Sequence, residues 1–325
     1  MHCTVEIERL PNGLYRASCA MFPDCQAVAA TADAARERVE QAIEFILRQT
    51  MNPIDSLFQE LRSHGRKAFM PFVTAGDPDL SATRQLVRRL AQCGANLVEI
   101  GFPYSDPIAD GPVIQASYNR ALKKGLPIAD LFATVQELTQ LPELQAVPLV
   151  AMVSYSLVYR RGTRRFVEQA KGAGFSGLIV PDLPIEDQGG DAETLFQLAT
   201  EHNLKLIQLV TPTTPPQRSA RIVRLCSGFV YVVSVTGITG ERDRLPERLL
   251  DQLRLLRQQT DLPLCVGFGV SKPEHAAMLR EVADGIIVGS AIIRRLEQAE
   301  DKPWADVEND IAAFVRPLVG ALNPL

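Results

Sequence analysis

The sequence predicts an α/β protein in which a (β/α)8 barrel over residues 51–325 follows a small α+β unit of the ββα type over residues 1–50. From about residue 52 onward, short apolar segments alternate with amphipathic helical segments. Continuous apolar segments are typical of parallel strands that helices cover on both faces. The chain has 325 residues, which exceeds the roughly 250 residues of a single barrel. Its length therefore leaves room for a second, smaller unit.

The first 50 residues carry a hairpin pattern and then a helical pattern. Apolar and acidic residues alternate over residues 4–10, which predicts a strand. Pro11-Asn12-Gly13 predicts a hairpin turn, because asparagine and glycine tolerate the positive φ of such turns. Residues 14–20 supply the returning strand, and a third strand is suggested over residues 26–30. A helix is expected to begin near Thr31, a suitable N-cap, with an apolar side made of Ala35, Val39, Ala42, Ile43, Ile46 and Leu47.

This segment resembles the small domain of HicB-type antitoxins. The shared order is a glycine turn, a Pro-x-Cys segment at Pro23-Asp24-Cys25, a threonine that starts the helix, and an alanine-rich helix. The resemblance rests on patterning and not on reactive groups. The first 50 residues are therefore interpreted as a packing or regulatory appendage.

Eight apolar segments in the rest of the chain predict short strands. Eight strands with eight crossovers close into a barrel more readily than they form an open sheet of that width, so a TIM barrel is expected. The predicted strands are residues 69–74, 97–101, 148–153, 177–180, 206–210, 229–234, 264–268 and 285–288. Helical patterns lie between them at residues 80–93, 163–171, 193–202, 217–225, 246–259 and 272–282.

Composition excludes several classes of function. The net charge is −4 without a long run of one sign, whereas nucleic-acid binding normally needs a basic face. No apolar stretch reaches the roughly 18 residues of a membrane span, and the N-terminus lacks the basic and apolar regions of a signal peptide. The six cysteines form no C-x-x-C pair, and the four histidines lack metal-ligand spacing. We expect a cytoplasmic protein with structural thiols and no metal site.

Glu99 is a carboxyl group inside the apolar second strand of the predicted barrel. In such barrels, chemistry takes place where strands end and the following loops begin. Burying a carboxyl group is costly unless it is paired or a raised pKa neutralises it. That environment suits a group that donates and accepts protons near neutral pH. The alternative is a structural glutamate satisfied by backbone amides, and position alone does not separate the two interpretations.

The loop after this strand, residues 102–112, adds Asp106 and Asp110. Its prolines and its glycine stiffen the segment, which suits side chains that must be held in place. Asp110 precedes Gly111-Pro112, where a helix is expected to start. An N-cap role for Asp110 is therefore the structural alternative to a catalytic one.

Glycines mark the ends of the last two predicted strands, where many barrels bind phosphate. Gly267-Phe268-Gly269 ends the seventh strand, and Gly289-Ser290-Ala291 ends the eighth and opens a short helix. Backbone N–H groups at these loops hold phosphate in many barrels, and glycine lets the main chain approach closely. Gly269, Gly289 and Ser290 are therefore predicted to bind phosphate, the alternative being ordinary turn glycines. After the sixth strand, residues 234–246 form a long polar loop with two glycines, interpreted as a water-excluding lid or as a surface loop.

Residues 99–112, with 94–96 before them and 114–115 after them, resemble the signature of tryptophan synthase α chains. Residues 69–78 resemble the first strand and loop of that family, and residues 180–184 its fourth. The similarity runs in register from residue 52 to the C-terminus. It implies a lyase that cleaves indole-3-glycerol phosphate into indole and D-glyceraldehyde 3-phosphate in L-tryptophan biosynthesis.

The resemblance also implies roles for individual residues. Glu99 matches the family's general acid/base, and Asp110 matches the residue that hydrogen-bonds the indole N–H. An ionised Asp110 would stabilise the positive charge that develops on the ring when C3 is protonated. The implied substrate pocket contains Phe72, Leu209, Tyr231, Thr239 and Phe268, with Thr239 helping to position the catalytic carboxylate, and the implied phosphate site contains Gly240, Gly269, Gly289 and Ser290.

The resemblance further implies a partner. This chain would carry no cofactor, and a β subunit with pyridoxal phosphate would receive the indole in an αββα heterotetramer. Residues 103–110 would belong to the surface that faces that subunit. One departure affects the pocket: Ser154-Tyr155-Ser156 stands where the family commonly has a tyrosine and, two residues later, an asparagine.

Other functions compete with this lyase. Paired carboxylates also suit glycoside hydrolysis, but that leaves the phosphate glycines without a purpose. Indole-glycerol-phosphate synthase would need a lysine near the strand ends, whereas Lys67 and Lys205 lie at predicted strand beginnings. A non-enzymatic regulatory binder that uses residues 1–50 would have a degenerate barrel, which the intact Glu99 and Asp110 argue against. A free-standing lyase that releases indole would need the same residues, so it stays open.

Overall fold

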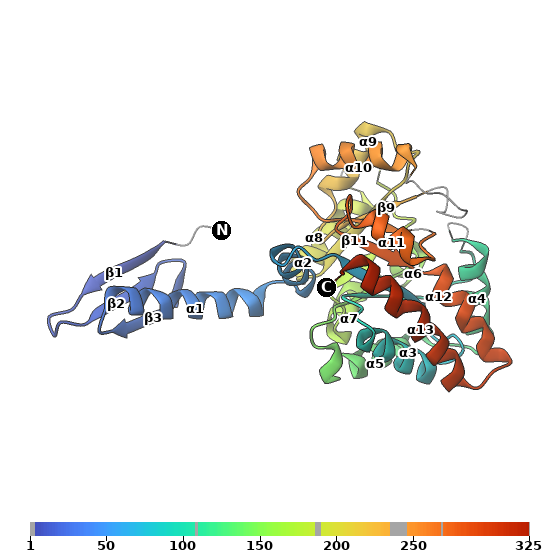
Figure 1. The fold of residues 1–325 in the computed structure, drawn as a ribbon, viewed down its shortest axis with the longest axis horizontal. Helices are drawn as coiled ribbons and strands as arrows, with labels where there is room; N and C mark the ends of the chain where they lie inside the picture. Colours follow the sequence, from blue (N-terminus) through green and yellow to red (C-terminus); the bar gives the residue numbers. More distant parts are fainter. Residues whose placement is uncertain (1–3, 108–109, 186–189, 235–245, 268, 325) are drawn as a thin grey trace. The chain divides into compact units, whose positions relative to one another are not determined.

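The chain divides into two compact units, Met1–Asn52 and Pro53–Leu325. The computed structural model describes residues 4–107, 110–185, 190–234, 246–267 and 269–324, with the backbone alone over residues 44–50. Figure 1 shows the fold and labels several helices and strands of each unit.

The small unit consists of three strands and a helix. Strands β1 (Val5–Arg9), β2 (Tyr15–Cys19) and β3 (Phe22–Ala29) pair antiparallel in that order. Gly13 in the first turn has φ of 84°, as the predicted hairpin requires. The third strand begins at Phe22, earlier than predicted. Helix α1 (Ala32–Thr50) follows Thr31, whose Oγ1 accepts the N–H of Ala34 at 3.2 Å, so the predicted N-cap is confirmed.

Helix α1 supplies part of the apolar side that the sequence pattern predicted, while the side chains of Ile46 and Leu47 lie outside the described residues. Ala35, Val39 and Ile43 recur every four residues and therefore lie on one side of the helix. That side packs against all three strands. The core of the small unit is made of Ala17, Cys19, Cys25, Ala29, Ala35, Val39 and Ile43.

The larger unit is a closed barrel of eight parallel strands, which confirms the predicted fold class. Each pairs with its neighbour in chain order, and β10 pairs with β9 and β11, while β11 returns to β4. The predicted bounds agree with the observed ones to within two residues. The strands are β4 (Ala68–Thr74), β5 (Val98–Gly101), β6 (Leu149–Met152), β7 (Gly177–Ile179), β8 (Lys205–Val210), β9 (Val230–Val233), β10 (Leu264–Gly267) and β11 (Gly285–Val288).

Helices surround this barrel (Figure 1). Helix α3 packs beside α5 and α13, and α13 packs beside α11 and α12. The helices are α2 (Pro53–Ser63), α3 (Leu80–Gln92), α4 (Pro112–Lys123), α5 (Ile128–Thr139), α6 (Tyr155–Arg161), α7 (Thr163–Ala173), α8 (Asp191–Glu201), α9 (Pro216–Arg224), α10 (Glu247–Gln259), α11 (Pro273–Leu279), α12 (Ser290–Leu296) and α13 (Trp304–Leu322), with short 3-10 helices η1 (Pro142–Leu144) and η2 (Glu297–Glu300). Within the described part of the chain, no helix combines the length and the apolar character of a membrane span.

Helix α2, which the strand-and-helix pattern did not predict, closes the N-terminal end of the barrel. Ile54 is fully buried, and a Cβ atom built on Gly177 would lie 2.9 Å from its Cδ1. Gly228, at the start of the segment that leads into β9, lies against the same side chain. Glycine at these positions leaves room for the plug, so the opposite, C-terminal end of the barrel is left for a site.

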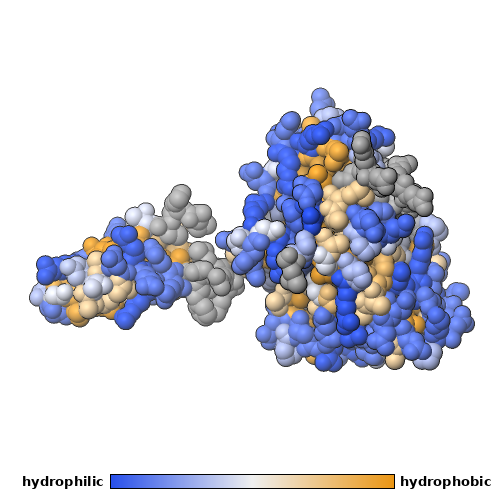
Figure 2. Space-filling view, viewed as in Figure 1, coloured by the Kyte–Doolittle hydropathy of each residue, from blue (hydrophilic) through white to orange (hydrophobic). Residues whose placement is uncertain are grey.

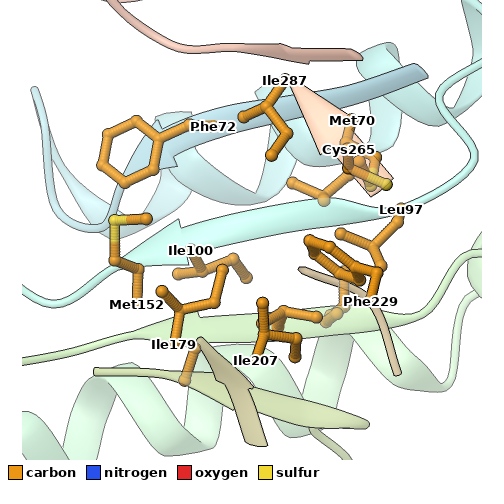
Figure 3. Packing of buried hydrophobic residues seen from close by; sticks show 14 of the residues in the cluster. Met70, Phe72, Leu97, Ile100, Met152, Ile179, Ile207, Phe229, Cys265 and Ile287 are labelled. Atoms are coloured by element: carbon orange, nitrogen blue, oxygen red, sulfur yellow. The ribbon is translucent and has the colours of Figure 1, made fainter. Parts of the chain in front are cut away.

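Side chains from different strands fill the middle of the barrel. Figure 3 shows Met70, Ile207 and Ile287 among the side chains that gather between the strands, and all three are at most 2% exposed. Hydrophilic residues cover most of the visible face of the larger unit (Figure 2). The barrel interior is therefore a packed apolar core, and any polar group inside it must have a specific cause.

A buried ion pair ties the loop after β4 to α4, and its loss should destabilise the barrel. Asp77 is 2% exposed and accepts from Nε and Nη2 of Arg120 at 3.0 and 2.7 Å. We expect Asp77→Ala to lower the free energy of unfolding by about 3 kcal/mol, because it leaves a largely buried guanidinium without its main partner. Urea unfolding followed by the fluorescence of Trp304, the only tryptophan, measures this change in the barrel itself.

The matched control is Asp251→Ala, which removes an ion pair between Asp251 and Arg254 whose side chains are both more than 60% exposed. Its expected cost is below about 0.5 kcal/mol. Equal effects of the two substitutions would contradict the structural importance of the buried pair.

Candidate active site

One cavity of about 770 Å³ opens among the loops that follow the barrel strands. It is lined by seven of the residues that the sequence analysis assigned to a site: Phe72, Asp110, Leu209, Tyr231, Gly269, Gly289 and Ser290. Three others, Thr239, Gly240 and Phe268, lie outside the described residues. The remaining one, Glu99, does not line the cavity and is fully buried. The structure therefore brings the carboxylate loop and the phosphate glycines to one cavity.

Glu99 lies in the middle of β5 with its carboxyl group enclosed by the barrel. It is 0% exposed, and its register partner on β4 is Phe72. Neither carboxyl oxygen has a hydrogen-bond partner among the described residues. Burial alone raises the pKa of Glu99 well above its ordinary range. Burial therefore favours the neutral form of this carboxyl group, and the structural alternative of backbone amides holding it is wrong for the described backbone.

Glycines at the strand ends make room for aromatic side chains around Glu99. A Cβ atom on Gly101 would lie 2.5 Å from Cζ of Phe72 and 2.9 Å from the hydroxyl of Tyr118. A Cβ atom on Gly267 would collide with the ring and hydroxyl of Tyr231. Any larger residue at these two ends would displace rings that are packed against the site. The glycines are thus required by close packing and not by turn geometry.

Asp110 precedes α4 and is held by backbone and side-chain hydrogen bonds. Its N–H donates to the carbonyl of Pro107 at 3.1 Å, and Nε2 of Gln115 donates to the carbonyl of Asp110 at 2.8 Å. The N-cap of α4 is Gly111, with no side-chain cap. The alternative role of Asp110 as an N-cap is therefore wrong. Instead, the hydroxyl of Tyr104 donates to Oδ2 of Asp110 at 3.3 Å.

The two carboxyl groups differ in how far their pKa values are raised. Burial raises the pKa of Asp110 to about 6, with the hydrogen bond from Tyr104 lowering it and the charge of Asp182 raising it. Asp110 is therefore mostly ionised at neutral pH, whereas burial favours the neutral form of Glu99 more strongly. Two acids whose surroundings separate their pKa values are the arrangement that acid–base chemistry at one centre requires.

Glu99 and Asp110 both affect the pKa values of Tyr118 and Tyr231. Burial raises the pKa of Tyr118, and the charges of Asp110, Tyr104 and Glu99 add to the effect. Burial also raises the pKa of Tyr231, with further contributions from Glu99 and Asp110. Glu99 and Asp110 therefore lie close enough to act on the same phenols, although they come from a strand and from the loop after it.

Two arginines that the sequence analysis did not identify also line the cavity. Arg218 belongs to α9, and Arg294 belongs to α12, which begins at Ser290 beside the predicted phosphate glycines. In the sequence, each arginine is a basic residue on the helix that follows one of the site loops. The helical periodicity of the apolar residues shows only that such an arginine lies on the polar face of its helix. Together with the glycine backbone they give part of the cavity wall a positive character.

The unusual Ser154-Tyr155-Ser156 segment forms a cap instead of part of the cavity wall. Oγ of Ser154 accepts from the N–H of Ser156 at 3.2 Å, which starts α6, and donates to Asp182 at 2.8 Å. Asp182 also accepts the N–H of Tyr155 at 2.7 Å. None of these three residues of the segment is among those that line the cavity. In the described part of the chain no group of three or more His, Cys, Asp or Glu side chains could hold a metal ion.

Comparison with known proteins decides the family. The family model described as "Tryptophan synthase alpha chain" matches residues 58–320. The chain belongs to the tryptophan synthase alpha chain family. It is 54% identical over 252 residues to the tryptophan synthase alpha chain of Rhodopirellula baltica, covering 78% of this chain and 89% of that protein. It is 45% identical to that of Rippkaea orientalis, covering 84% and 99%.

Solved structures agree with this assignment. Tryptophan synthase subunit alpha from Legionella pneumophila str. Paris superposes with a TM-score of 0.75 at 33% identity, covering 85% of this chain and all of that chain. A chain of tryptophan synthase from M. tuberculosis, in its aminoacrylate-bound form, superposes with a TM-score of 0.72 at 29% identity, covering 84% and 100%.

Membership in the tryptophan synthase alpha chain family fixes the reaction class. Its members are lyases that cleave indole-3-glycerol phosphate in L-tryptophan biosynthesis. The alpha chain carries no cofactor, and the pyridoxal phosphate belongs to the beta subunit with which it works. The small unit precedes the matched span, which begins at residue 58.

The burial of Glu99 predicts a pH-dependent cost to stability. Folding raises its pKa, so its contribution is fully present below the unfolded pKa and is lost as pH rises through the folded pKa. Between the unfolded and the folded pKa, the free energy of unfolding of the wild-type protein falls by up to about 1.4 kcal/mol per pH unit. Glu99→Gln lacks this loss because it has no carboxyl group to ionise. We therefore expect the variant to be the more stable protein at pH 8 and the difference to shrink towards pH 4, measured by urea unfolding with Trp304 fluorescence.

The control is Glu281→Gln, which removes a carboxyl group that is 69% exposed. Its difference from wild type should stay nearly constant over the same pH range. A constant difference for Glu99→Gln as well would mean that Glu99 ionises as readily in the folded protein as in the unfolded chain.

Proposed function

We propose that Glu99 and Asp110 together carry out a retro-aldol cleavage of indole-3-glycerol phosphate. The protonated Glu99 gives its proton to C3 of the indole ring, which leaves the ring positively charged. The ionised Asp110 accepts a hydrogen bond from the ring N–H and stabilises that charge. The carboxylate formed on Glu99 then takes the proton of the side-chain hydroxyl next to C3.

Loss of that proton completes the reaction without water. The oxygen forms the aldehyde of glyceraldehyde 3-phosphate, the carbon–carbon bond breaks, and its electron pair returns to the ring to give neutral indole. Glu99 ends in its starting protonation state. The observation that supports this proposal is the separation of the two pKa values: Asp110 at about 6 and Glu99 well above its ordinary range.

The remaining cavity residues are proposed to hold the rest of the substrate. Phe72, Leu209 and Tyr231, which line the cavity, would form the walls for the flat indole ring, together with Thr239 and Phe268. The backbone N–H groups of Gly269, Gly289 and Ser290, with Gly240, would bind the phosphate. We add Arg218 and Arg294, whose guanidinium groups suit a doubly charged phosphate.

We further propose that the protein acts in the cytoplasm in an αββα heterotetramer and passes its indole to the beta subunit. The loop over residues 103–110 would face that partner, while it also presents Asp110 to the cavity. The two-unit division supports an appendage over residues 1–50 that is separate from the catalytic barrel over residues 51–325.

Indole-glycerol-phosphate synthase is disfavoured by the position of the lysines. Lys205 begins β8 and pairs with Asp55 of α2, the helix that closes the N-terminal end of the barrel. The backbone of Lys67 is tied to Asn323 just before β4. Neither lysine is among the residues that line the cavity.

Removing either acid should abolish turnover without unfolding the protein. We expect Asp110→Asn and Glu99→Gln each to lower kcat by at least about 100-fold, the lower range for loss of a positioned proton-transfer or electrostatic group. Indole release from indole-3-glycerol phosphate measures the effect in the purified chain. Asp106→Asn, an exposed carboxylate in the same loop, should keep its activity there. Wild-type turnover by either of the first two variants would remove the proposed mechanism.

The separated pKa values predict a bell-shaped pH dependence. As pH rises through about 6, kcat/KM should increase because Asp110 ionises, and at higher pH it should fall because Glu99 loses its proton. Initial rates at constant ionic strength between pH 5 and pH 9, a range chosen about neutrality, test both limbs. A rate that is highest at pH 5, the acidic end of this range, would show that an ionised Asp110 is not required.

A further inference from the structure

Tyr104 is the side chain that holds Asp110. Its hydroxyl lies 3.3 Å from Oδ2 of Asp110, and this is the one side-chain hydrogen bond of that carboxyl group to another described residue. The two residues lie six positions apart in the same stiff loop. Burial, the charges of Asp110 and Asp182 and the hydrogen bond all raise the pKa of Tyr104. The phenol therefore keeps its proton and can only donate to a charged Asp110.

The ring of Tyr104 packs against the ring of a second tyrosine, Tyr118. Its centroid lies 5.5 Å from that of Tyr118 on α4, with the planes at 51°. Tyr118 is 1% exposed, and its hydroxyl occupies the space that a Cβ atom on Gly101, two residues beyond Glu99 in β5, would need. Tyr104 thus packs against a buried ring of α4 that lies beside the end of β5, the strand that carries Glu99.

We propose that Tyr104 is a positioning residue for the reaction: it binds Oδ2 of Asp110, keeps that group ionised, and leaves Oδ1 to accept the indole N–H. The inference rests on the proposed role of Asp110. A carboxylate has two oxygens, so one can be fixed by the protein while the other meets the substrate. Without the phenol, the carboxylate would have to be oriented by the substrate itself, at an entropic cost.

Other charged and titratable groups also act on Asp110 and must be separated from Tyr104. Asp182, in the loop after β7, opposes ionisation of Asp110. Glu99 on β5, Tyr118 on α4 and Tyr231 on β9 are also near, because the pKa values of both tyrosines respond to both acids. Tyr104 therefore lowers the pKa of Asp110 and Asp182 raises it. Removing each in turn should shift the acidic midpoint in opposite directions.

The test compares the pH dependence of kcat/KM in Tyr104→Phe with that of the wild-type enzyme. Phenylalanine keeps the ring packing on Tyr118 and removes only the hydrogen bond. Because that bond favours the charged form of Asp110, its loss should move the acidic midpoint up by about 0.5–1 on the pH scale, the shift expected for one neutral donor. At pH 6 the activity should fall about threefold, while at pH 8 it should stay within about twofold of wild type.

Two further variants make the result decisive. Tyr159→Phe removes a phenol that is 66% exposed and stacks on Tyr155, so its pH profile should equal that of wild type. Asp182→Asn keeps side-chain atoms that can bond to Ser154 and the N–H of Tyr155 but removes the charge. At low ionic strength it should move the acidic midpoint down, and salt should weaken this effect because Asp182 is exposed.

A Tyr104→Phe profile that overlays the wild-type one would overturn the inference, as would an acidic midpoint that stays at the wild-type pH while activity is lost. Either result would leave the proposed function intact if Asp110→Asn is inactive. If Asp110→Asn keeps its activity, the proposed function itself fails and the role of Tyr104 falls with it.

Discussion

The structure depends on one constraint, a carboxyl group sealed inside an apolar barrel without a hydrogen-bond partner among the described residues. Glu99 is fully buried at the centre of β5, and the fold accommodates it by favouring its neutral form. A neutral acid is what protonation of indole C3 requires. The surroundings follow from the same constraint: glycine ends β5 and β10, so that the rings of Phe72, Tyr118 and Tyr231 can enclose the space next to this group.

Asp110 needs an environment that favours its charged form, and the loop that follows β5 supplies it. It lines the cavity and receives a hydrogen bond from a phenol, and burial raises its pKa to about 6. The surroundings thereby favour the neutral form of Glu99 more strongly than that of Asp110. The stability that Glu99 costs the fold and the proton that it offers the substrate have the same physical origin, because both come from burial of a carboxyl group.

Much of this could be predicted from the sequence, since the eight strands are short apolar runs between helical patterns and the Thr31 cap and the Gly13 turn have local signals. Helix α2 has a local signal in the helical spacing of Ile54, Leu57, Phe58 and Leu61, but its role as a plug depends on Gly177 and Gly228, which lie far away in sequence. Glu99 could be identified as a candidate site residue because it is a carboxyl group in an apolar strand. The individual roles of Glu99 and Asp110 followed only from the family resemblance. The bond between Tyr104 and Asp110 could not be predicted, because a tyrosine in a proline-rich loop shows neither its direction nor its support. Arg218 and Arg294 were missed because a polar helix face looks the same whether it meets solvent or a cavity.

The central claim is that Glu99 is protonated and Asp110 ionised in the folded enzyme at neutral pH. Isotope-edited infrared spectroscopy of the intact protein measures this directly, because the carbonyl stretch of a protonated carboxyl group is separate from the bands of carboxylates. The account predicts a protonated-carboxyl band at pH 7 that disappears in Glu99→Gln and persists in Asp110→Asn. A band that disappears instead with Asp110, or the absence of any band sensitive to Glu99, would contradict it.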